Sequence, residues 1–231
     1  MPEQNTDLKS GHDDEQSALL LVVPAAEPAV REHRARLDLS ARDGVPAHFT
    51  VLYPFLPPSQ IRDADLSALA GVFAGVSSFA FTLDRIGWFG EQVAWLGPRD
   101  PEPFRALTVL THQAFPGYSP YGGRYADADV IPHLTIGHDA GLDVLRAAAD
   151  SVREHLPIDG TATEVTLMAG PKPGTPGTPP GTWRASPRSP WPSAAAPRRL
   201  ALRITARSVR RSRIGDRRAP QGVHADPTSA P

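Results

Sequence analysis

The sequence contains no cysteine among its 231 residues. This absence excludes a thiol nucleophile, a cysteine-ligated zinc or iron–sulfur site, and disulfide bonds. Lysine is nearly absent too, since only Lys9 and Lys172 are present and 22 arginines supply the rest of the basic charge. Histidine is therefore the side chain left for acid–base chemistry near neutral pH.

The sequence also lacks a long hydrophobic run. Its first 16 residues are polar and acidic, unlike the basic start of a signal peptide. The apolar run at 18–26 is far shorter than the roughly 20 residues that a membrane span needs. We therefore expect a cytoplasmic protein without a membrane partner.

The formal net charge of −1 conceals two unlike parts. Residues 1–170 hold 12 basic and 23 acidic side chains, whereas residues 171–231 hold 12 basic and 2 acidic ones together with 12 of the 26 prolines. A Pro-rich, basic composition with few apolar runs does not offset the conformational entropy lost on folding. We predict a disordered segment at 1–16, a folded domain at 17–170 with an outer limit near residue 185, and a disordered tail at 171–231.

Hydrophobic periodicity predicts an α+β domain. Short apolar or β-branched runs indicate strands, and apolar residues spaced by three and four indicate helices. The strands are expected at 17–23, 45–55, 79–86, 92–96, 130–138 and 162–169. The helices are expected at 27–37, 65–76, 102–115 and 142–156. The strand–helix–strand order recurs, and the similarity of VPAHFTVL to VIPHLTIG suggests an internal duplication.

Two His-x-Thr tripeptides lie in predicted strands. Because side chains alternate along a strand, His48 and Thr50 share one face, as do His133 and Thr135. If the two strands lie side by side about a pseudo-twofold axis, two imidazoles and two hydroxyls meet in one cleft. Cleavage of a phosphodiester without a metal needs one base and one acid, and two histidines supply both. The hydroxyls would donate hydrogen bonds to the phosphate oxygens.

At these residues the sequence resembles the 2H phosphoesterase superfamily, in particular its 2'-5' RNA ligase and cyclic phosphodiesterase-like branch. The resemblance covers residues 17–185 approximately and rests on HFTVLYPF and PHLTIGH. It implies a bilobal, pseudo-twofold α+β fold with the two HxT strands facing a central cleft. It also implies cofactor-free hydrolysis or ligation at a 2',3'-cyclic or 2'-5' phosphodiester. His48 and His133 would be acid and base in an order left open, and Thr50 and Thr135 would bind phosphate.

The loop at 116–129 precedes the second motif and carries further candidates. Tyr121 and Arg124 would offer a stacking face and a phosphate-binding guanidinium, with Tyr118 and Tyr125 beside them. The alternative is a plain surface loop. Two other groups receive structural interpretations. Trp88 and Trp95 are expected in the core, and His112 and His155 on helices are expected to be structural.

Three rival interpretations remain open. A metal site at His133, His138 and Asp139 has no common ligand spacing. A non-catalytic member of the same fold would use the cleft to bind a nucleotide or phosphate. The acidic domain does not favour a long nucleic acid, so an RNA end or small nucleotide is the expected partner, but the basic tail could serve as an RNA-binding arm.

The tail departs from the family pattern. A final strand is disfavoured at Pro187, Pro190 and Pro192, although 198–209 alternates and would suit a replacement strand. We interpret the sequence beyond about Trp183 as a divergent or frame-shifted extension.

Overall fold

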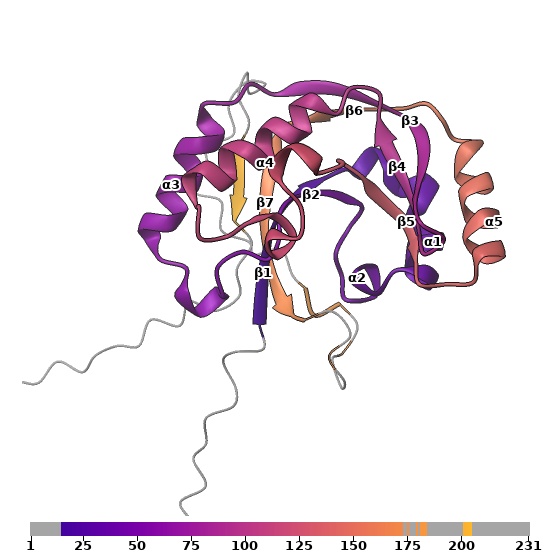
Figure 1. Cartoon of the computed structure of the whole chain (residues 1–231), viewed down its shortest axis with the longest axis horizontal. Coiled ribbons are helices and arrows are strands. Elements are labelled where there is room, and N and C mark those ends of the chain that lie inside the picture. The colour runs from indigo at the N-terminus through magenta and orange to yellow at the C-terminus, as the bar shows by residue number, and fades with distance from the viewer. Residues whose placement is uncertain (1–14, 173–174, 176–178, 180, 184–200, 205–231) are drawn as a thin grey trace, which may run out of the picture.

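Two four-stranded sheets form the centre of the protein (Figure 1). The computed structural model describes residues 15–172, 175, 179, 181–183 and 201–204. The first sheet has the order β2-β1-β7-β8, and the second has the order β5-β4-β3-β6. The strands of the first sheet are β1 (Glu15–Val22), β2 (His48–Leu52), β7 (Glu164–Pro171) and β8 (Ala201–Ile204). Those of the second are β3 (Phe79–Phe89), β4 (Val93–Pro98), β5 (Leu134–His138) and β6 (Ile158–Ala162). All neighbours are antiparallel except β7 and β8.

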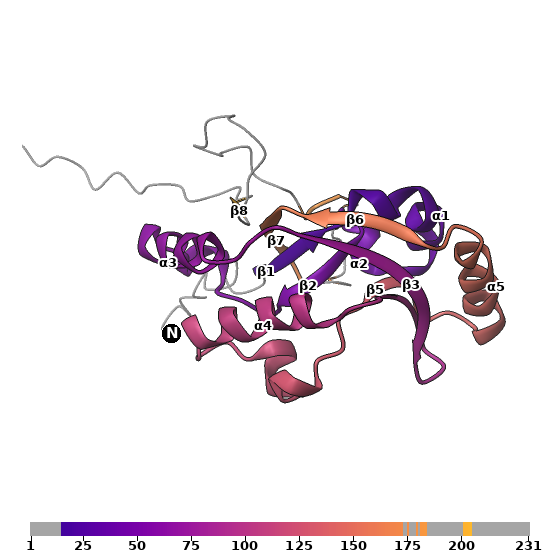
Figure 2. The ribbon, with the colours of Figure 1, turned by 90° about the horizontal axis from the view of Figure 1, so that it is seen from above.

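Helices cover both sheets, and two of them pack against the sheet that does not contain the strand preceding them in the sequence. The helices are α1 (Glu27–Leu37), α2 (Leu39–Arg42), α3 (Asp63–Ala74), α4 (Glu102–Ala114) and α5 (Leu142–Arg153), with one-turn helices η1 (Pro24–Ala26), η2 (Pro58–Gln60), η3 (Pro120–Gly123) and η4 (Asp127–Asp129). α1 follows a strand of the first sheet but packs on β5, whereas α4 follows a strand of the second sheet but packs on β2. α3 and α5 lie at opposite ends of the molecule in both views (Figures 1 and 2). The expected bilobal α+β fold is confirmed, with each lobe assembled from both halves of the sequence.

A cluster of phenylalanines joins the two lobes behind the site. The ring of Phe104, at the start of α4, lies 4.3 Å from the ring of Phe49 on β2, measured between centroids. It also meets Phe79 and Phe81 of β3 edge-on, at 5.3 and 5.4 Å. Aromatic pairs in this geometry stabilise the fold beyond the effect of the apolar area they bury. The side chain of Phe104 therefore holds β2 against a strand of the other sheet.

Several element boundaries differ from the sequence expectation for identifiable reasons. β3 continues through Gly87 to Phe89, and the turn falls at Gly90, where φ is +55°. Gly87 stays inside the strand because the indole of Trp95 lies on it, and a Cβ there would come within 2.1 Å of that ring. β6 was not expected, because Asp159 and Gly160 are poor strand formers. It forms by pairing along the edge of β3.

The chain after β7 returns to the first sheet. The backbone N–H groups of Gly181 and Trp183 donate to the carbonyls of Arg42 and Asp43, over 2.9 and 2.6 Å. The Trp183 indole N–H donates to the Pro171 carbonyl over 2.8 Å, and the ring is 4% exposed. It lies on Gly170, where a Cβ would come within 2.5 Å of it.

Further along, β8 pairs parallel to β7, at the place where alternation suited a replacement strand. The predicted disordered segment at 1–16 lies almost wholly outside the described residues. Most of the basic tail also lies outside the described residues, including the proposed frame-shifted extension and RNA-binding arm apart from β8. Within the part of the chain that the structure describes, no helix is long and apolar enough to cross a membrane.

Replacing Trp183 with alanine tests the contribution of this return segment. Because the ring is buried and fills the space above a glycine, Trp183→Ala should lower the free energy of unfolding by about 3–5 kcal/mol. Tyr125→Ala removes an aromatic ring that is 51% exposed and should change it by less than about 0.5 kcal/mol. Urea unfolding of both variants checks this. Equal, small losses would mean that the segment is not part of the folded unit.

Candidate active site

The two HxT motifs lie at the starts of β2 and β5, since His48 is the first residue of β2 and His133 directly precedes β5. In each motif the histidine and the threonine are half-buried, whereas the residue between them is fully buried. Phe49 is 1% exposed and Leu134 is 0% exposed, so the back face of each strand belongs to the core. The Cα atoms of β2 and β5 approach to within 8 Å. The two histidines are also close enough for the charge of His133 to act on His48.

Each histidine makes the same hydrogen bond. Nδ1 of His48 lies 2.7 Å from the carbonyl oxygen of Pro46, and Nδ1 of His133 lies 2.8 Å from that of Ile131. A carbonyl oxygen only accepts, so Nδ1 carries the hydrogen in both rings. Nε2 is then the nitrogen that accepts a proton in the neutral ring and donates it in the charged ring. The same local geometry thus prepares both imidazoles for proton transfer at Nε2.

Burial disfavours the charged form of both imidazoles. It lowers the pKa of His48 to about 4, with the nearby positive charges of Arg34 and His133 acting in the same direction. The hydrogen bond to Pro46 and the carboxylate of Asp38 oppose this shift. Burial also lowers the pKa of His133, against the hydrogen bond to Ile131. Because two imidazolium charges in one site repel each other, states in which at most one of the two rings is positively charged are favoured.

A buried ion pair lies beside His48. The guanidinium of Arg34 donates to one carboxylate oxygen of Asp38 over 3.1 and 2.9 Å, and these residues are 3% and 6% exposed. The other carboxylate oxygen accepts from the backbone N–H and hydroxyl of Ser40, over 2.9 and 2.7 Å. Burial alone would raise the pKa of Asp38, but Arg34 and Ser40 lower it overall. In addition, Glu27 accepts from the backbone N–H of Ala47 over 2.7 Å, which fixes the residue before His48.

Aromatic rings surround His133 instead. Phe89 meets its ring edge-on at 4.8 Å, Trp95 lies at 6.3 Å, and Tyr121 is stacked at 6.4 Å with an interplanar angle of 21°. The assignment of Trp95 to the core is therefore incomplete, because one side of its indole contacts the catalytic candidate. Trp88 is half-buried and packs against the main core as expected.

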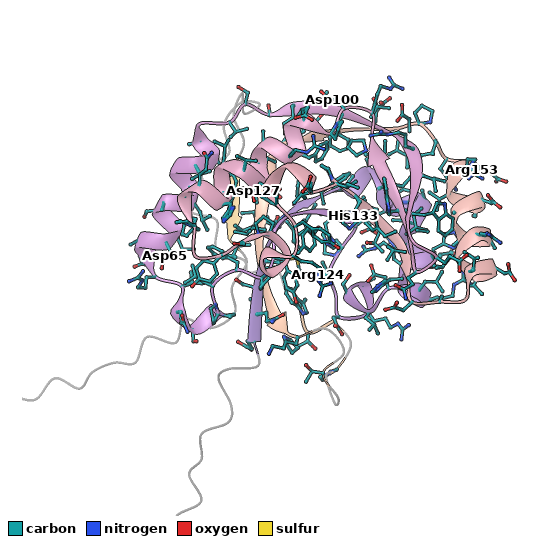
Figure 3. The ribbon with its side chains drawn as sticks, in the orientation of Figure 1. Asp65, Asp100, Arg124, Asp127, His133 and Arg153 are labelled. Carbon is teal, nitrogen blue, oxygen red and sulfur yellow. The ribbon has the colours of Figure 1, made fainter. Side chains whose placement is uncertain are left out.

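Tyr121 connects the two motifs. Its backbone N–H donates to the carbonyl of Tyr53 over 2.7 Å, its hydroxyl lies near the side chain of Thr50, and its ring stacks on His133. Burial raises the pKa of Tyr121 to about 12, so the phenol stays neutral in any ordinary buffer. Arg124 lies exposed in the same loop, toward the middle of the molecule in Figure 3, where His133 and Asp127 are also labelled. Tyr125 is exposed and touches Tyr121 edge-on.

Tyr118 has a different environment from the other loop tyrosines. Its ring packs against Phe55 at 5.5 Å, so it anchors the start of the loop rather than facing the motifs. Phe115 meets the other side of Phe55 at 5.2 Å. These contacts fix the loop to the chain that leaves β2.

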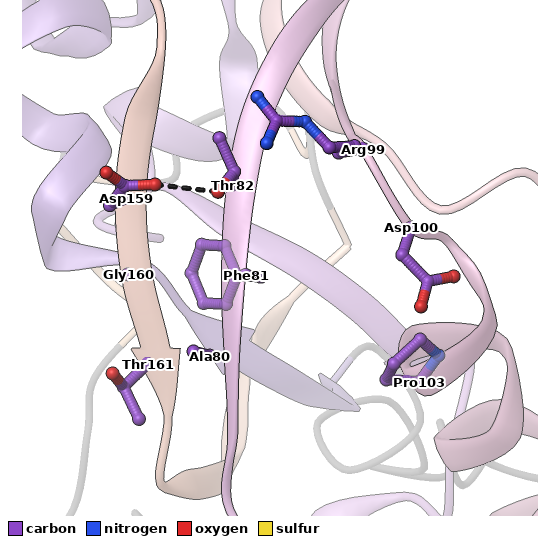
Figure 4. A pocket seen from close by; sticks show the side chains of 9 residues that line it. All are labelled: Ala80, Phe81, Thr82, Arg99, Asp100, Pro103, Asp159, Gly160 and Thr161. Atoms are coloured by element: carbon purple, nitrogen blue, oxygen red, sulfur yellow. Dashed lines mark hydrogen bonds between the residues drawn. The ribbon is translucent and has the colours of Figure 1, made fainter.

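A cavity of about 110 Å³ adjoins the first motif. It is lined by Ala18, Leu20, Ser40, Val45, His48, Thr50, Tyr53 and Trp183. The return segment after β7 thus supplies one wall beside His48. A larger hollow of about 520 Å³ lies over β3, β6 and the start of α4, where Thr82 donates to Asp159 over 2.7 Å (Figure 4). None of its lining residues belongs to the HxT motifs or to the loop at 116–129.

The rival metal site at His133, His138 and Asp139 does not assemble among the described residues. His138 is the last residue of β5, beyond a β-bulge that follows Thr135, and there it is exposed and contacts Asp139 at 3.2 Å. Among the described residues, no group of three histidine or acidic side chains is placed to hold a metal ion.

The family follows from comparison with known proteins. The sequence model of the 2'-5' RNA ligase superfamily matches residues 22–172, and the chain belongs to this superfamily. A comparison with curated proteins finds no match. Solved structures that are similar include E. coli LigT complexed with 3'-AMP, at 22% identity and a TM-score of 0.41, over 69% of this chain and 89% of that one.

Two further solved structures are similar over most of their length. E. coli LigT complexed with NADP+ is 21% identical, with a TM-score of 0.44 over 82% of this chain and 98% of that one. Usb1 of Kluyveromyces marxianus is 15% identical, with a TM-score of 0.31 over 70% and 94%.

The lowered pKa of His48 makes stability depend on pH. Between about pH 4 and pH 6.5 the unfolded chain binds a proton at this position that the folded chain does not, so the free energy of unfolding should rise with pH. His48→Gln should reduce that rise, and His138→Gln, at an exposed position on the same sheet as the second motif, should leave it in place. Urea unfolding at about pH 4.5 and about pH 7 measures the difference. An unchanged slope in His48→Gln would contradict the burial of this imidazole.

Proposed function

We propose that the protein is a metal-independent phosphoesterase that acts on a 2',3'-cyclic or 2'-5' phosphodiester, at an RNA end or in a small nucleotide. The observation that carries the proposal is the matched pair of imidazoles, one at the start of β2 and one directly before β5, each held through Nδ1 by the carbonyl two residues before it. Membership of the 2'-5' RNA ligase superfamily supports a phosphoesterase type of chemistry.

The proposed hydrolysis needs one proton removed and one proton delivered. The neutral imidazole takes a proton from water at Nε2 as the water oxygen forms a bond to phosphorus. The protonated imidazole gives its Nε2 proton to the ribose oxygen as that oxygen leaves phosphorus. The hydroxyls of Thr50 and Thr135 donate to the non-bridging oxygens, whose charge grows in the transition state. The negative phosphate favours the one protonated imidazole that the cycle requires.

The groups around each histidine distinguish the base from the acid. Burial and Arg34 outweigh Asp38 and lower the pKa of His48 to about 4, so we assign His48 as the base and His133 as the acid in hydrolysis. Ligation is the reverse reaction, and the roles exchange in it. Tyr121, whose neutral hydroxyl lies near Thr50, is proposed to donate a third hydrogen bond to the phosphate. Arg124 is proposed as a peripheral ligand for the same anion.

Substitution of the histidines tests the chemistry. His48→Ala and His133→Ala should each lower kcat for a 2',3'-cyclic nucleotide by about 10²- to 10⁴-fold, with EDTA present throughout. His138→Ala serves as the matched control and should retain full activity. Turnover that survives both substitutions would refute the proposal, and loss of turnover on adding EDTA would favour a metal site. Nucleotide binding without turnover in the wild type would identify a binding module.

A substrate with a better leaving group separates acid from base. Bis(4-nitrophenyl) phosphate releases a phenolate that needs little protonation, so His133→Ala should lose much less activity on it than on a cyclic nucleotide. His48→Ala should lose activity on both, because the water still has to be deprotonated. The opposite pattern would exchange the assignments.

The pH profile follows from the two lowered pKa values. The reactive form of the free protein carries one protonated and one neutral imidazole. This form becomes scarce when the pH exceeds the higher of the two pKa values. The value of kcat/KM should therefore peak below pH 6.5 and fall by about tenfold per pH unit at higher pH. Initial rates at low substrate concentration measure it. A maximum above about pH 8 would show that another group limits the reaction.

A further inference from the structure

A second hydrogen-bonded group lies outside the two motifs. Nδ1 of His112, in the last turn of α4, lies 2.8 and 2.9 Å from the two carboxylate oxygens of Asp127. A carboxylate accepts, so Nδ1 carries the hydrogen. Nε2 of the neutral ring is then an acceptor, and the hydroxyl of Ser119 lies 3.4 Å from it. Asp127 and Ser119 come from opposite ends of one loop, and His112 links them to the helix.

The backbone between these two ends is strained. Tyr121 has φ of +52°, and Gly122 and Gly123 follow with φ of +67° and +78°. This left-handed backbone conformation costs a residue with a side chain about 1–2 kcal/mol of conformational free energy. Such a conformation persists only where the surrounding structure holds it. The group formed by His112, Ser119 and Asp127, here called the loop clasp, holds the segment at both sides of Tyr121.

The strained turn places the Tyr121 side chain. Because the chain reverses at 121–123, the phenol ring reaches His133 and its hydroxyl reaches Thr50, while its N–H bonds to Tyr53. A loop that relaxed to ordinary negative φ values would give up these contacts together. The position of Tyr121 between the motifs therefore depends on what fixes residues 119–127.

We propose that His112, Ser119 and Asp127 are positioning residues that hold Tyr121 between the two HxT motifs; their effect on turnover rests on the proposed phosphoesterase function. They touch neither histidine of the motifs and act through the loop. The three side chains have the composition of a hydrolytic triad, but Ser119 lines neither of the two cavities described above. A second nucleophilic site is therefore the weaker interpretation of the same contacts.

Three loop variants distinguish the loss of the loop clasp's hydrogen bond from the loss of a negative charge. Asp127→Ala removes the acceptor for His112, whereas Asp127→Asn keeps an acceptor oxygen and removes only the charge. Asp129→Ala is the matched control, because Asp129 is an exposed aspartate in the same one-turn helix. We expect kcat/KM for a 2',3'-cyclic nucleotide to fall at least about tenfold in Asp127→Ala, less than about threefold in Asp127→Asn, and hardly at all in Asp129→Ala.

A double-mutant cycle identifies the route of the effect. If Asp127 acts through Tyr121, then Asp127→Ala should change kcat/KM by less than about twofold once Tyr121→Ala is already present. A residue with a merely structural role would give the same loss in both backgrounds. Equal losses, or no loss in the single variant, would overturn the proposal.

Hydrogen exchange gives a readout that does not need turnover. Amides in 117–126 should exchange faster in Asp127→Ala than in Asp129→Ala, while those of β2 and β5 stay unchanged. If the wild type hydrolyses no phosphodiester, the proposed function fails, and faster exchange confined to this loop would still support the clasp. Unchanged exchange in Asp127→Ala would overturn it, whatever the activity.

Discussion

The alternation of side chains along β2 and β5 is the constraint on which the site depends. Each strand must present a buried residue to the core every second position, and Phe49 and Leu134 fix the register because neither can turn toward water. The histidine and threonine on either side then have to face away from the core. A slip of one residue would bury two imidazoles and expose the core residue between them. The site is thus held by the packing behind it.

The crossing helices couple the two motifs. α1 follows a strand of the first sheet yet packs on β5, and α4 precedes β5 yet packs on β2. Each motif strand is therefore backed by a helix connected to a strand of the other sheet. Phe104 adds a direct link, since its ring contacts Phe49 behind the first motif and Phe81 in the second sheet. We infer that the two lobes cannot separate without exposing the common core, so the distance between the imidazoles is set by the fold.

Local patterns predicted much of this arrangement. The helix at 27–37 has the expected bounds, and the alternation around His48 and His133 gave the correct faces, because both depend on periodicity alone. The pairing of the sheets and the crossing of the helices depend on contacts between distant segments. The role of Trp95 beside His133 was missed for the same reason, since it requires Gly87 on β3 and Gly97 on β4 to leave room for the ring.

Only part of the loop before the second motif could be predicted from the sequence. Its tyrosines were recognisable as candidates, and Tyr121 does meet both motifs. His112 gave no comparable signal, because a single histidine on a helix is usually structural, and its partners lie 7 and 15 residues away. A hydrogen-bonded group drawn from a helix and both ends of a loop becomes visible only when the loop's path is known. The positive φ of Tyr121 is likewise a property of the fold rather than of its side chain.

The two motifs carry the same histidine and threonine, but the two lobes surround them with different residues. Beside His48 lies the buried pair of Arg34 and Asp38, whereas rings of Phe89, Trp95 and Tyr121 surround His133. A cation near one imidazole raises the cost of a second positive charge there, while aromatic faces tolerate a cation. In the proposed reaction, proton transfer in a fixed direction needs this inequality, because two equivalent imidazoles would share the one additional proton without preference. An internal duplication alone would give symmetry, and the residues around each histidine supply the difference that the proposed mechanism requires.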